Sequence, residues 1–271
     1  MRERRTVALT GAGISTESGI PDYRRPDGTR RSPDPMRHST FVESPEARRR
    51  YWARSAVGWP RFRAARPNDG HRALARLEEA GLTSGVITQN VDRLHQQAGS
   101  RRVVDLHGAL ADVRCLNCER VSCRDAFQER MLRANPGFPP GAVKLRPDGD
   151  ATLPDGAAEG FEVPRCTACS GALMPGVVFF GGRVPEGRVE AAWRLYDEAE
   201  VLLVLGSSLA VYSGFRFALR ARKEGRPFAV VNLGPVRGTE EDAAAHVQAP
   251  LGEALPKLAR ALTGRAGPIW D

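Results

Sequence analysis

Four of the five cysteines stand in two pairs with the spacing of metal ligands. Cys115 and Cys118 form one CxxC pair, and Cys166 and Cys169 form the other. A CxxC turn presents two thiolates at a separation that suits two corners of a tetrahedral zinc site, and a second CxxC supplies the other two. The sequence therefore predicts one structural zinc ion on these four residues. No coordination position is left for catalysis.

Two disulfides or one redox-active CxxC would use the same residues. We expect neither, because the cysteine count is odd, no export signal is seen, and a redox pair needs only one CxxC. Cys123 lies just outside the first pair and is expected to take no part, since four thiolates already close the site. Other residues must then carry the chemistry of the chain.

A glycine turn follows the strand-like run Thr6–Thr10. Gly11, Ala12 and Gly13 come directly before a helix-compatible stretch, where backbone N–H groups can approach a phosphate. The spacing differs from the dehydrogenase fingerprint G-x-G-x-x-G, because the next glycine is Gly19. Taken alone, the turn is a weak indication of nucleotide binding.

The elements that must position these residues alternate along the chain. Further buried strands are predicted at 85–88, 201–205 and 227–231, and helices at 44–62, 68–80, 186–199 and 213–224. This alternation predicts an α/β fold, a Rossmann-like doubly wound parallel sheet.

One region departs from the alternation. Residues 111–180 hold every cysteine, so we expect a small inserted zinc-binding module there, with a long Pro/Gly-rich loop at 135–164. Residues 1–110 and 181–271 would form the Rossmann-like domain.

The composition of the chain bears on whether it binds nucleic acid or a membrane. The formal net charge is +8 and 41% of the residues are hydrophobic. The positive charge is almost all arginine and is scattered, so we expect a generally basic surface and no nucleic-acid partner. No run approaches the roughly 18 apolar residues of a membrane span, and no targeting segment is recognised. We expect a soluble cytoplasmic protein without a membrane partner.

The stretch from Gly11 to Arg24, GAGISTESGIPDYR, resembles the signature of the sirtuins. Further motifs of that family follow in its order: TQNVD at 88–92, HG at 107–108, GSS at 206–208, NLG at 232–234 and the cysteine pairs. Four stretches are closest to class II, typified by the mitochondrial sirtuin four: RYWAR at 50–54, VGWP at 57–60, PDGD at 147–150 and VVFFG at 177–181. The resemblance spans nearly the whole chain.

The resemblance implies an NAD-dependent protein-lysine deacylase, with NAD lying between the Rossmann-like domain and the zinc module. In this reaction the acyl oxygen of a modified lysine attacks the ribose carbon that bears nicotinamide, and nicotinamide leaves. A general base then deprotonates a ribose hydroxyl. His107 matches that base, and a histidine with a near-neutral pKa suits the task. The products are free lysine, nicotinamide and O-acyl-ADP-ribose. NAD as co-substrate and structural zinc are the expected cofactors.

The resemblance also assigns site residues. His107, Asn90 and Asp92 would be catalytic, while Val178 and Phe179 would line the acyl-lysine channel. The expected NAD contacts are Gly11, Ala12, Gly13, Asp22, Tyr23, Arg24, Gln89, Asn90, Val91, Asp92, Gly206, Ser207, Ser208, Asn232, Leu233, Gly234 and Leu251. In isolation, Asn90 and Asp92 could simply cap a helix that begins near Asp92, and His107 could be structural.

Tyr51 and Arg54 bear on the acyl group. A related sirtuin class binds acidic acyl groups with Tyr-x-x-Arg at the matching place, and i and i+3 share a helix face. A guanidinium there would recognise a carboxylate, so we expect longer or acidic acyl groups to outcompete acetyl. The alternative is a salt bridge from Arg54 away from the pocket. Gly182 and the run from Tyr212 to Gly214 depart from the family pattern beside the substrate channel, which also weakens an expectation of simple acetyl preference.

Two other functions would use the same residues. One is protein ADP-ribosyl transfer, in which a protein nucleophile intercepts the ribosyl centre. The other is a zinc-ribbon binding module that senses NAD without chemistry, which the full set Gln89, Asn90, Asp92 and His107 makes the weakest reading. The expected partners are proteins with acylated lysines, and we expect a monomer.

Overall fold

The computed structural model describes residues 4–31, 35–138, 149–154, 156–238 and 243–264 of the 271. The chain divides into two compact units. The sheet unit comprises Met1–Arg31, Arg66–Leu106 and Val184–Asp271, and the cysteine unit comprises Ser32–Ala65 and His107–Arg183. The expected division had put all of residues 1–110 into the NAD-binding part, whereas here 32–65 belongs to the cysteine unit.

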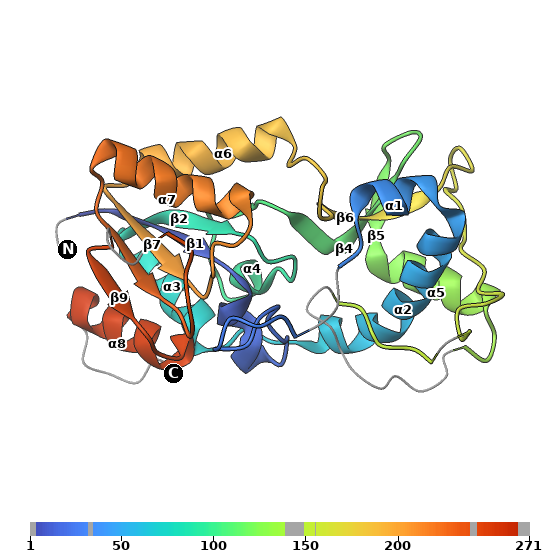
Figure 1. The fold of residues 1–271 in the computed structure, drawn as a ribbon, viewed down its shortest axis with the longest axis horizontal. Coiled ribbons are helices and arrows are strands. Elements are labelled where there is room, and N and C mark those ends of the chain that lie inside the picture. Colours follow the sequence, from blue (N-terminus) through green and yellow to red (C-terminus); the bar gives the residue numbers. More distant parts are fainter. Residues whose placement is uncertain (1–3, 32–34, 139–148, 155, 239–242, 265–271) are drawn as a thin grey trace. The chain divides into compact units, whose positions relative to one another are not determined.

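The sheet unit is built on a parallel sheet (Figure 1). Among the described residues its strand order is β3-β2-β1-β7-β8-β9, and every pairing is parallel. The strands are β1 Thr6–Thr10, β2 Thr83–Thr88, β3 Val103–Asp105, β7 Val201–Leu205, β8 Phe228–Val231 and β9 Ala245–Val247. Chain order reverses direction at β1 and β7, which is the switch point where such sheets bind ligands.

Helices cover both faces of this sheet. They are η1 Ala12–Ser18, a 3-10 helix, with α3 Asp69–Glu79, α4 Leu94–Gln97, α6 Glu186–Asp197, α7 Tyr212–Glu224 and α8 Leu251–Thr263. Alternate residues of β1 enter different cores: Val7 and Leu9 pack with residues of α6 and α7, and Ala8 packs with residues of α3 and α8. Side chains of a strand point alternately to opposite faces, so both faces are buried and the strands are apolar throughout. The predicted doubly wound fold is confirmed.

The cysteine unit contains a smaller antiparallel sheet of order β5-β4-β6. Its elements are α1 His38–Glu43, α2 Pro45–Ala64, β4 Gly108–Cys115, β5 Val121–Cys123, α5 Arg124–Ala134 and β6 Leu173–Val177. Helix α2 starts after Ser44, whose hydroxyl accepts the N–H of Ala47 at 3.1 Å, and it has proline at its first position.

Aromatic burial explains why residues 32–65 join the cysteine unit. Phe41, Tyr51 and Trp52 lie in one core with Phe127 and Phe179. The indole N–H of Trp52 donates to the carbonyl of Leu173 on β6 at 3.0 Å. Burying such rings is among the largest favourable terms that a small unit has, so α1 and α2 complete this core. The loop predicted at 135–164 lies partly outside the described residues.

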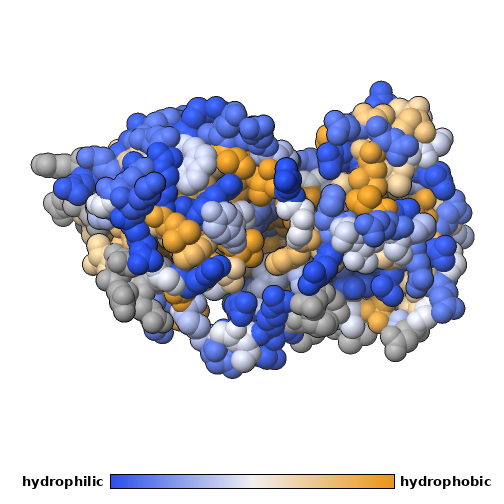
Figure 2. All heavy atoms as spheres, turned by 45° about the horizontal axis from the view of Figure 1, so that its top comes forward, coloured by the Kyte–Doolittle hydropathy of each residue, from blue (hydrophilic) through white to orange (hydrophobic). Residues whose placement is uncertain are grey.

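The surface is polar over most of the face drawn in Figure 2, with apolar residues in smaller groups. Among the described residues, no helix combines the length and the apolarity that a membrane crossing requires.

Candidate active site and zinc site

The four paired cysteines converge in the cysteine unit. Sγ of Cys115 lies 3.5 Å from Sγ of Cys169, and Sγ of Cys118 lies 3.7 Å from that of Cys166. All four sulfur atoms lie within 4.8 Å of one another. Four Zn–S bonds of about 2.3 Å in a tetrahedron place the sulfurs about 3.8 Å apart. The donor set and its spacing fit one structural zinc ion.

In both CxxC turns a backbone N–H group points to the sulfur of the first cysteine. Asn117 N–H points to Sγ of Cys115 at 3.4 Å, and Ala168 N–H points to Sγ of Cys166 at 3.5 Å. Hydrogen bonding from backbone N–H groups, that of Cys118 foremost, lowers the pKa of Cys115 to about 6. None of the five cysteines forms a disulfide. Cys123 lies outside the group of four, as expected.

The glycine turn lies against the turn that follows β7. Gly11 N–H donates to Leu205 O at 3.0 Å, and Gly13 N–H donates to Gly206 O at 2.9 Å. A Cβ at Gly11 would meet the carbonyl oxygen of Gly206 at 2.7 Å, and a Cβ at Gly13 would meet the Cα of Gly206 at 2.8 Å. Only glycine permits this approach, and Gly206 itself has φ 62°. Two turns thus meet at the carboxyl edge of β1 and β7.

Gln89 joins the same edge from β2. Its backbone N–H donates to Thr10 O at 2.9 Å, and its side-chain amide donates to Ser207 Oγ at 2.8 Å. Ser207 also accepts the N–H of Leu209 at 3.2 Å. Ser208, the next residue of this turn, is half-buried. Leu251, at the start of α8, is buried and lies beside Gly206.

Ser15 is a junction of polar groups just past the glycine turn. Its hydroxyl donates to Asp92 Oδ2 at 2.7 Å and accepts from the side-chain amide of Asn90 at 3.1 Å. That amide also donates to Gly11 O at 3.1 Å, while Asp92 Oδ1 accepts the N–H of Leu94 at 2.9 Å. One carboxylate oxygen of Asp92 thus caps the start of α4, as the alternative interpretation expected, while the other accepts a hydrogen bond from Ser15. Val91 lies between these two residues in the sequence and is half-buried.

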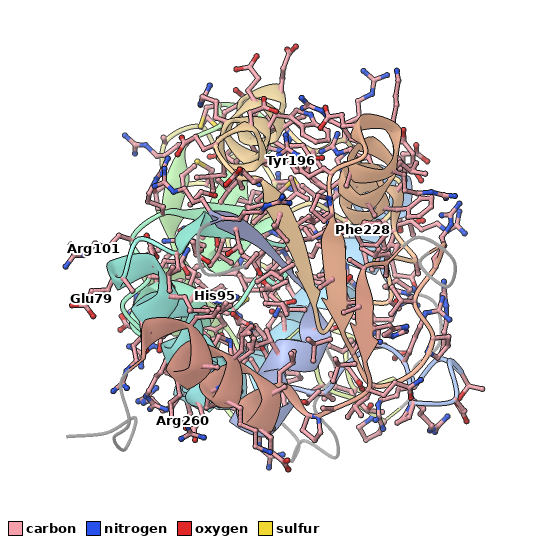
Figure 3. The ribbon with its side chains drawn as sticks, turned by 90° about the vertical axis from the view of Figure 1, so that its left-hand side faces the viewer. Glu79, His95, Arg101, Tyr196, Phe228 and Arg260 are labelled. Carbon is pink, nitrogen blue, oxygen red and sulfur yellow. The ribbon has the colours of Figure 1, made fainter. Side chains whose placement is uncertain are left out.

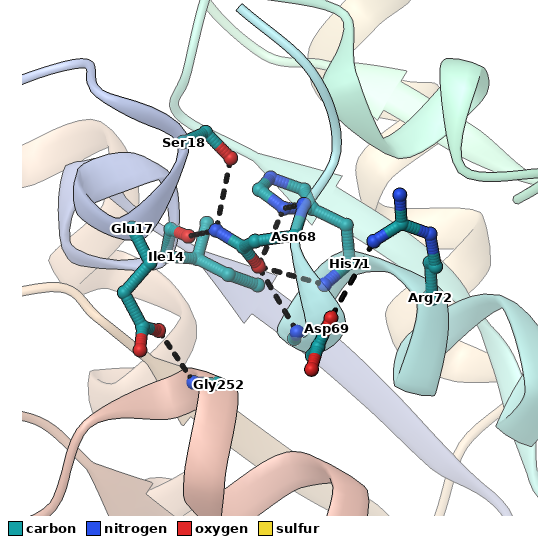
Figure 4. A network of polar contacts seen from close by, with 9 residues as sticks. Ile14, Glu17, Ser18, Asn68, Asp69, His71, Arg72 and Gly252 are labelled. Carbon is teal, nitrogen blue, oxygen red and sulfur yellow. Dashed lines mark hydrogen bonds and ion pairs between the residues drawn. The ribbon is translucent and has the colours of Figure 1, made fainter. Parts of the chain in front are cut away.

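Asn68 fastens η1 to the start of α3 (Figure 4). Its side-chain N–H groups donate to Ile14 O at 2.7 Å and Ser18 Oγ at 2.9 Å. Its side-chain oxygen accepts the N–H groups of Gly70 at 3.0 Å and His71 at 3.3 Å, which caps the helix. One residue thus fixes the helix that carries Ser15.

Two histidines lie beneath this cluster, and the sequence had given neither a function. His71 Nε2 lies 3.5 Å from Ser15 Oγ, and His95 Nε2 lies 2.9 Å from Thr10 Oγ1. Their rings are 4.8 Å apart, and Figure 3 places His95 inside the sheet unit. Burial lowers the pKa of His71 to about 2 and that of His95 to about 3. Burial also raises the pKa of Asp92.

These depressed values make stability depend on pH. In the unfolded chain a histidine titrates near pH 6.5, so below that pH the unfolded state binds protons that the folded state refuses. The contribution of each histidine is complete above pH 6.5 and falls by about 1.4 kcal/mol for each pH unit below it. The raised pKa of Asp92 has the opposite effect on stability, because the folded state then binds this proton more readily than the unfolded state as the pH falls.

Comparing the wild type with His95→Gln isolates the effect of His95, because both proteins contain Asp92. We expect the free energy of unfolding in urea to fall less steeply between pH 6.5 and 5 in His95→Gln than in the wild type, by about 1.4 kcal/mol per pH unit. Equal slopes for the two proteins would show that His95 is protonated in the folded state.

Two further groups of expected NAD contacts lie in two loops of the sheet unit. In one, Asp22 pairs with Arg31, and Arg24 donates to Gly28 O at 2.8 Å, while Tyr23 stays exposed. In the other, the Asn232 side chain donates to the carbonyls of Leu233 and Gly234, both at 3.1 Å. A Cβ at Gly234 would meet Pro26 O at 2.5 Å, so the loops touch.

His107 immediately precedes β4 in the cysteine unit. Its carbonyl accepts the N–H of Val178 at 2.8 Å, which places Val178 beside it just past the end of β6. Phe179 is buried with its ring 5.0 Å from that of Phe41 and 5.3 Å from that of Tyr51. Three residues assigned by resemblance, His107, Val178 and Phe179, are therefore neighbours.

Tyr51 and Arg54 have different surroundings. Tyr51 is 2% exposed within the aromatic core. Arg54 Nη2 lies 2.8 Å from Oδ2 of Asp150, and its Nε donates to Ala151 O at 3.2 Å. Arg54 thus forms a salt bridge, and its partner Asp150 belongs to the PDGD stretch at 147–150.

A model of the Sir2 family matches residues 11–213 of the chain. The chain belongs to the Sir2 family, the sirtuins. This agrees with the resemblance found in the sequence, and it makes the chain an NAD-dependent enzyme of the sirtuin type, with NAD as its co-substrate.

Curated relatives match the sirtuin over most of its length. The NAD-dependent protein deacetylase of Xanthomonas axonopodis pv. citri is 52% identical, over 88% of this chain and 82% of its own. NAD-dependent protein deacetylase 1 of Streptomyces coelicolor is 50% identical, over 98% and 89%. The NAD-dependent protein deacylase Sirt4 of Drosophila melanogaster is 46% identical, over 93% and 81%.

Solved sirtuin structures share the fold. One, described as the structural basis for the mechanism and regulation of Sir2 enzymes, has a TM-score of 0.75 and 32% identity, covering 96% of this chain and 93% of its own. Another, of Sir2 with a p53 peptide and NAD+, has a TM-score of 0.73 and 33% identity, covering 96% and 92%.

Sequence reasoning missed Ser15, His71, His95 and Asp150 as members of these clusters. The only available signal was local: Asn68 stands three residues before His71, as in a capping box, and the structure has that box.

Proposed function

We propose that this sirtuin removes acyl groups from protein lysines, consuming NAD and releasing nicotinamide and O-acyl-ADP-ribose. The observation that carries the proposal is the Ser15 junction, where Asn90 and Asp92 meet beside the glycine turn. A half-buried carboxylate next to amide and hydroxyl groups is suited to holding a carboxamide such as that of nicotinamide. It lies at the carboxyl edge of the parallel sheet, where such folds bind nucleotides.

The sheet unit is proposed to bind NAD. Backbone N–H groups of the glycine turn would approach its phosphates at the start of η1. Gln89 and Ser207 would orient a ribose, and Asn232 the adenosine end. The remaining proposed contacts are Ala12, Asp22, Tyr23, Arg24, Val91, Ser208, Leu233, Gly234 and Leu251.

His107 is proposed as the general base. Once nicotinamide has left, a ribose hydroxyl must lose a proton before it can attack the transferred acyl carbon. An imidazole does this near neutral pH. The zinc ion, held by four thiolates, would supply no reacting group; it would fix the end of β4, the strand that starts directly after His107.

Acylated-lysine proteins are the proposed substrates. Backbone groups near Val178 would pair with the peptide as an added strand. One solved relative is described as Sir2 with a p53 peptide and NAD+. A class II assignment, a cytoplasmic location and a monomeric chain stay predictions.

The acyl preference is proposed to extend beyond acetyl, to longer or acidic groups. Two features support this: the class II motifs of the sequence, and a relative named as a deacylase. The solved structure of Sir2Tm with a propionylated peptide illustrates a longer acyl group in that protein.

One experiment tests the reaction and its alternatives. The protein is incubated with acetyl-, butyryl- and glutaryl-lysine peptides and NAD labelled on the adenine ribose, and products are followed by mass spectrometry. We expect the label to leave as O-acyl-ADP-ribose, with one nicotinamide per deacylated lysine. Label retained on protein would establish ADP-ribosyl transfer instead, and no nicotinamide release with any peptide would indicate an NAD-sensing module.

A further inference from the structure

The segment with Asp150 and Ala151 packs on helix α2 and binds the side chain of Arg54, which belongs to that helix. Asp150 Oδ2 and Ala151 O both bind its guanidinium, at 2.8 and 3.2 Å. The carboxylate side chain is 3% exposed and the arginine 20%. A Cβ on Gly58 of α2 would meet the backbone carbon of Asp150 at 2.8 Å, so the segment packs directly on the helix. The pair is therefore fixed in a poorly hydrated place.

Only one edge of the Arg54 guanidinium is engaged. Nε and Nη2 make the two contacts, and Nη1 has no hydrogen-bond partner within the part of the chain that the structure describes. A guanidinium carries five N–H donors in a rigid plane. Anchoring one edge therefore leaves donors at the other edge in a defined direction.

A second guanidinium nearby is accounted for by other groups. Arg124 is 1% exposed and donates to Gln128 Oε1 at 2.8 Å and to Ser55 Oγ at 3.2 Å. Burial lowers its pKa to about 10, against the opposite influence of Asp150 and other groups. Asp150 is in direct contact with Arg54 at 2.8 Å and also acts on Arg124 through its charge.

The anchored arginine lies one helical turn from the proposed acyl channel. Tyr51 stands three residues before Arg54, on the same face of α2. Its ring is 5.3 Å from that of Phe179, whose neighbour Val178 bonds to His107. Every contact in this chain of neighbours lies within the cysteine unit.

We propose that Asp150 determines the acyl specificity of this enzyme by cancelling the charge of Arg54 while holding it in place. The channel then recognises a hydrogen-bond acceptor at the far end of the acyl chain, whether or not that acceptor is charged. An incoming carboxylate feels the attraction of Arg54 and the repulsion of Asp150 together, and in a poorly hydrated site both are strong. This inference rests on the proposed deacylase function.

The test compares two isosteric substrates. One peptide carries glutaryl-lysine, and the other carries the same chain with the carboxylate replaced by a carboxamide. For the wild type we expect kcat/KM values within about fivefold of each other. For Asp150→Asn we expect the ratio to move at least about tenfold toward the carboxylate, chiefly through KM, because Arg54 then acts as an uncompensated cation.

Two further proteins keep the test decisive. Asp125→Asn removes the carboxylate that pairs with Arg63 on the same helix at 2.8 Å, and its ratio should equal that of the wild type. If Asp150→Asn does not fold, as judged by thermal melting, the double variant Arg54→Gln/Asp150→Asn replaces the pair with neutral groups. It should keep the wild-type ratio within about threefold.

Three results would overturn the proposal. One is an unchanged ratio in folded Asp150→Asn, and another is an equal shift in Asp125→Asn. The third is a strong wild-type preference for the carboxylate that the double variant abolishes. If no acyl peptide releases nicotinamide, the proposed function itself fails, and that outcome is distinct from an altered ratio in an active enzyme.

Discussion

Replacing His107 with asparagine is expected to lower deacylation by about 10²- to 10⁴-fold while nicotinamide exchange continues. Loss of a general base typically costs that much. The acyl oxygen attacks the ribosyl carbon before the base is needed, so the first step and its reversal by added nicotinamide should persist. Deacylation is followed by mass spectrometry, and exchange by incorporation of labelled nicotinamide into NAD in the presence of acyl peptide.

The matched control for this prediction is His246→Asn. His246 lies on β9 and is exposed, so both activities should stay at wild-type level in that variant. If His107→Asn lost exchange and deacylation to the same extent, His107 would act in the first step or in folding, and the assignment as base would be wrong.

Removing a zinc ligand is expected to unfold the cysteine unit and abolish activity. Structural zinc contributes about 10–16 kcal/mol in small domains, which is as large as the total stability of an ordinary domain, about 5–15 kcal/mol. In Cys166→Ser, we expect zinc content to fall from one ion per chain toward zero. Amides of β4, including those near Cys115, should lose their protection from hydrogen exchange.

Cys123→Ser serves as the control for that prediction. It lies outside the group of four, so the variant should keep one zinc ion, its melting temperature and its activity. Full activity in a chain shown to be zinc-free and folded would mean that the cysteine unit does not depend on the metal.

Most of the correct predictions came from the spacing of residues close together in the sequence. The two CxxC pairs identified the group of four because each turn is set by its own few residues. The strands at 85–88 and 201–205 were recognised because buried parallel strands are apolar on both faces. The motif from Gly11 to Arg24 pointed to the sirtuin family, which the comparisons confirmed.

Contacts between distant segments were not predictable in the same way. No pattern in the sequence places the ring of His71 beside Ser15 or 4.8 Å from the ring of His95. The inclusion of 32–65 in the cysteine unit likewise depends on how Phe41, Tyr51 and Trp52 pack, and not on any boundary signal.

The sequence by itself thus determined the family, the sheet and the zinc ligands, because those depend on short spacings and on alternation along each strand. Tertiary structure alone decided the state of Arg54. The Tyr51-x-x-Arg54 spacing allows either a free guanidinium or a paired one, and the free energy of pairing depends on a carboxylate brought from a remote segment. Asp150 is that carboxylate, buried at 3% exposure and 2.8 Å from the guanidinium.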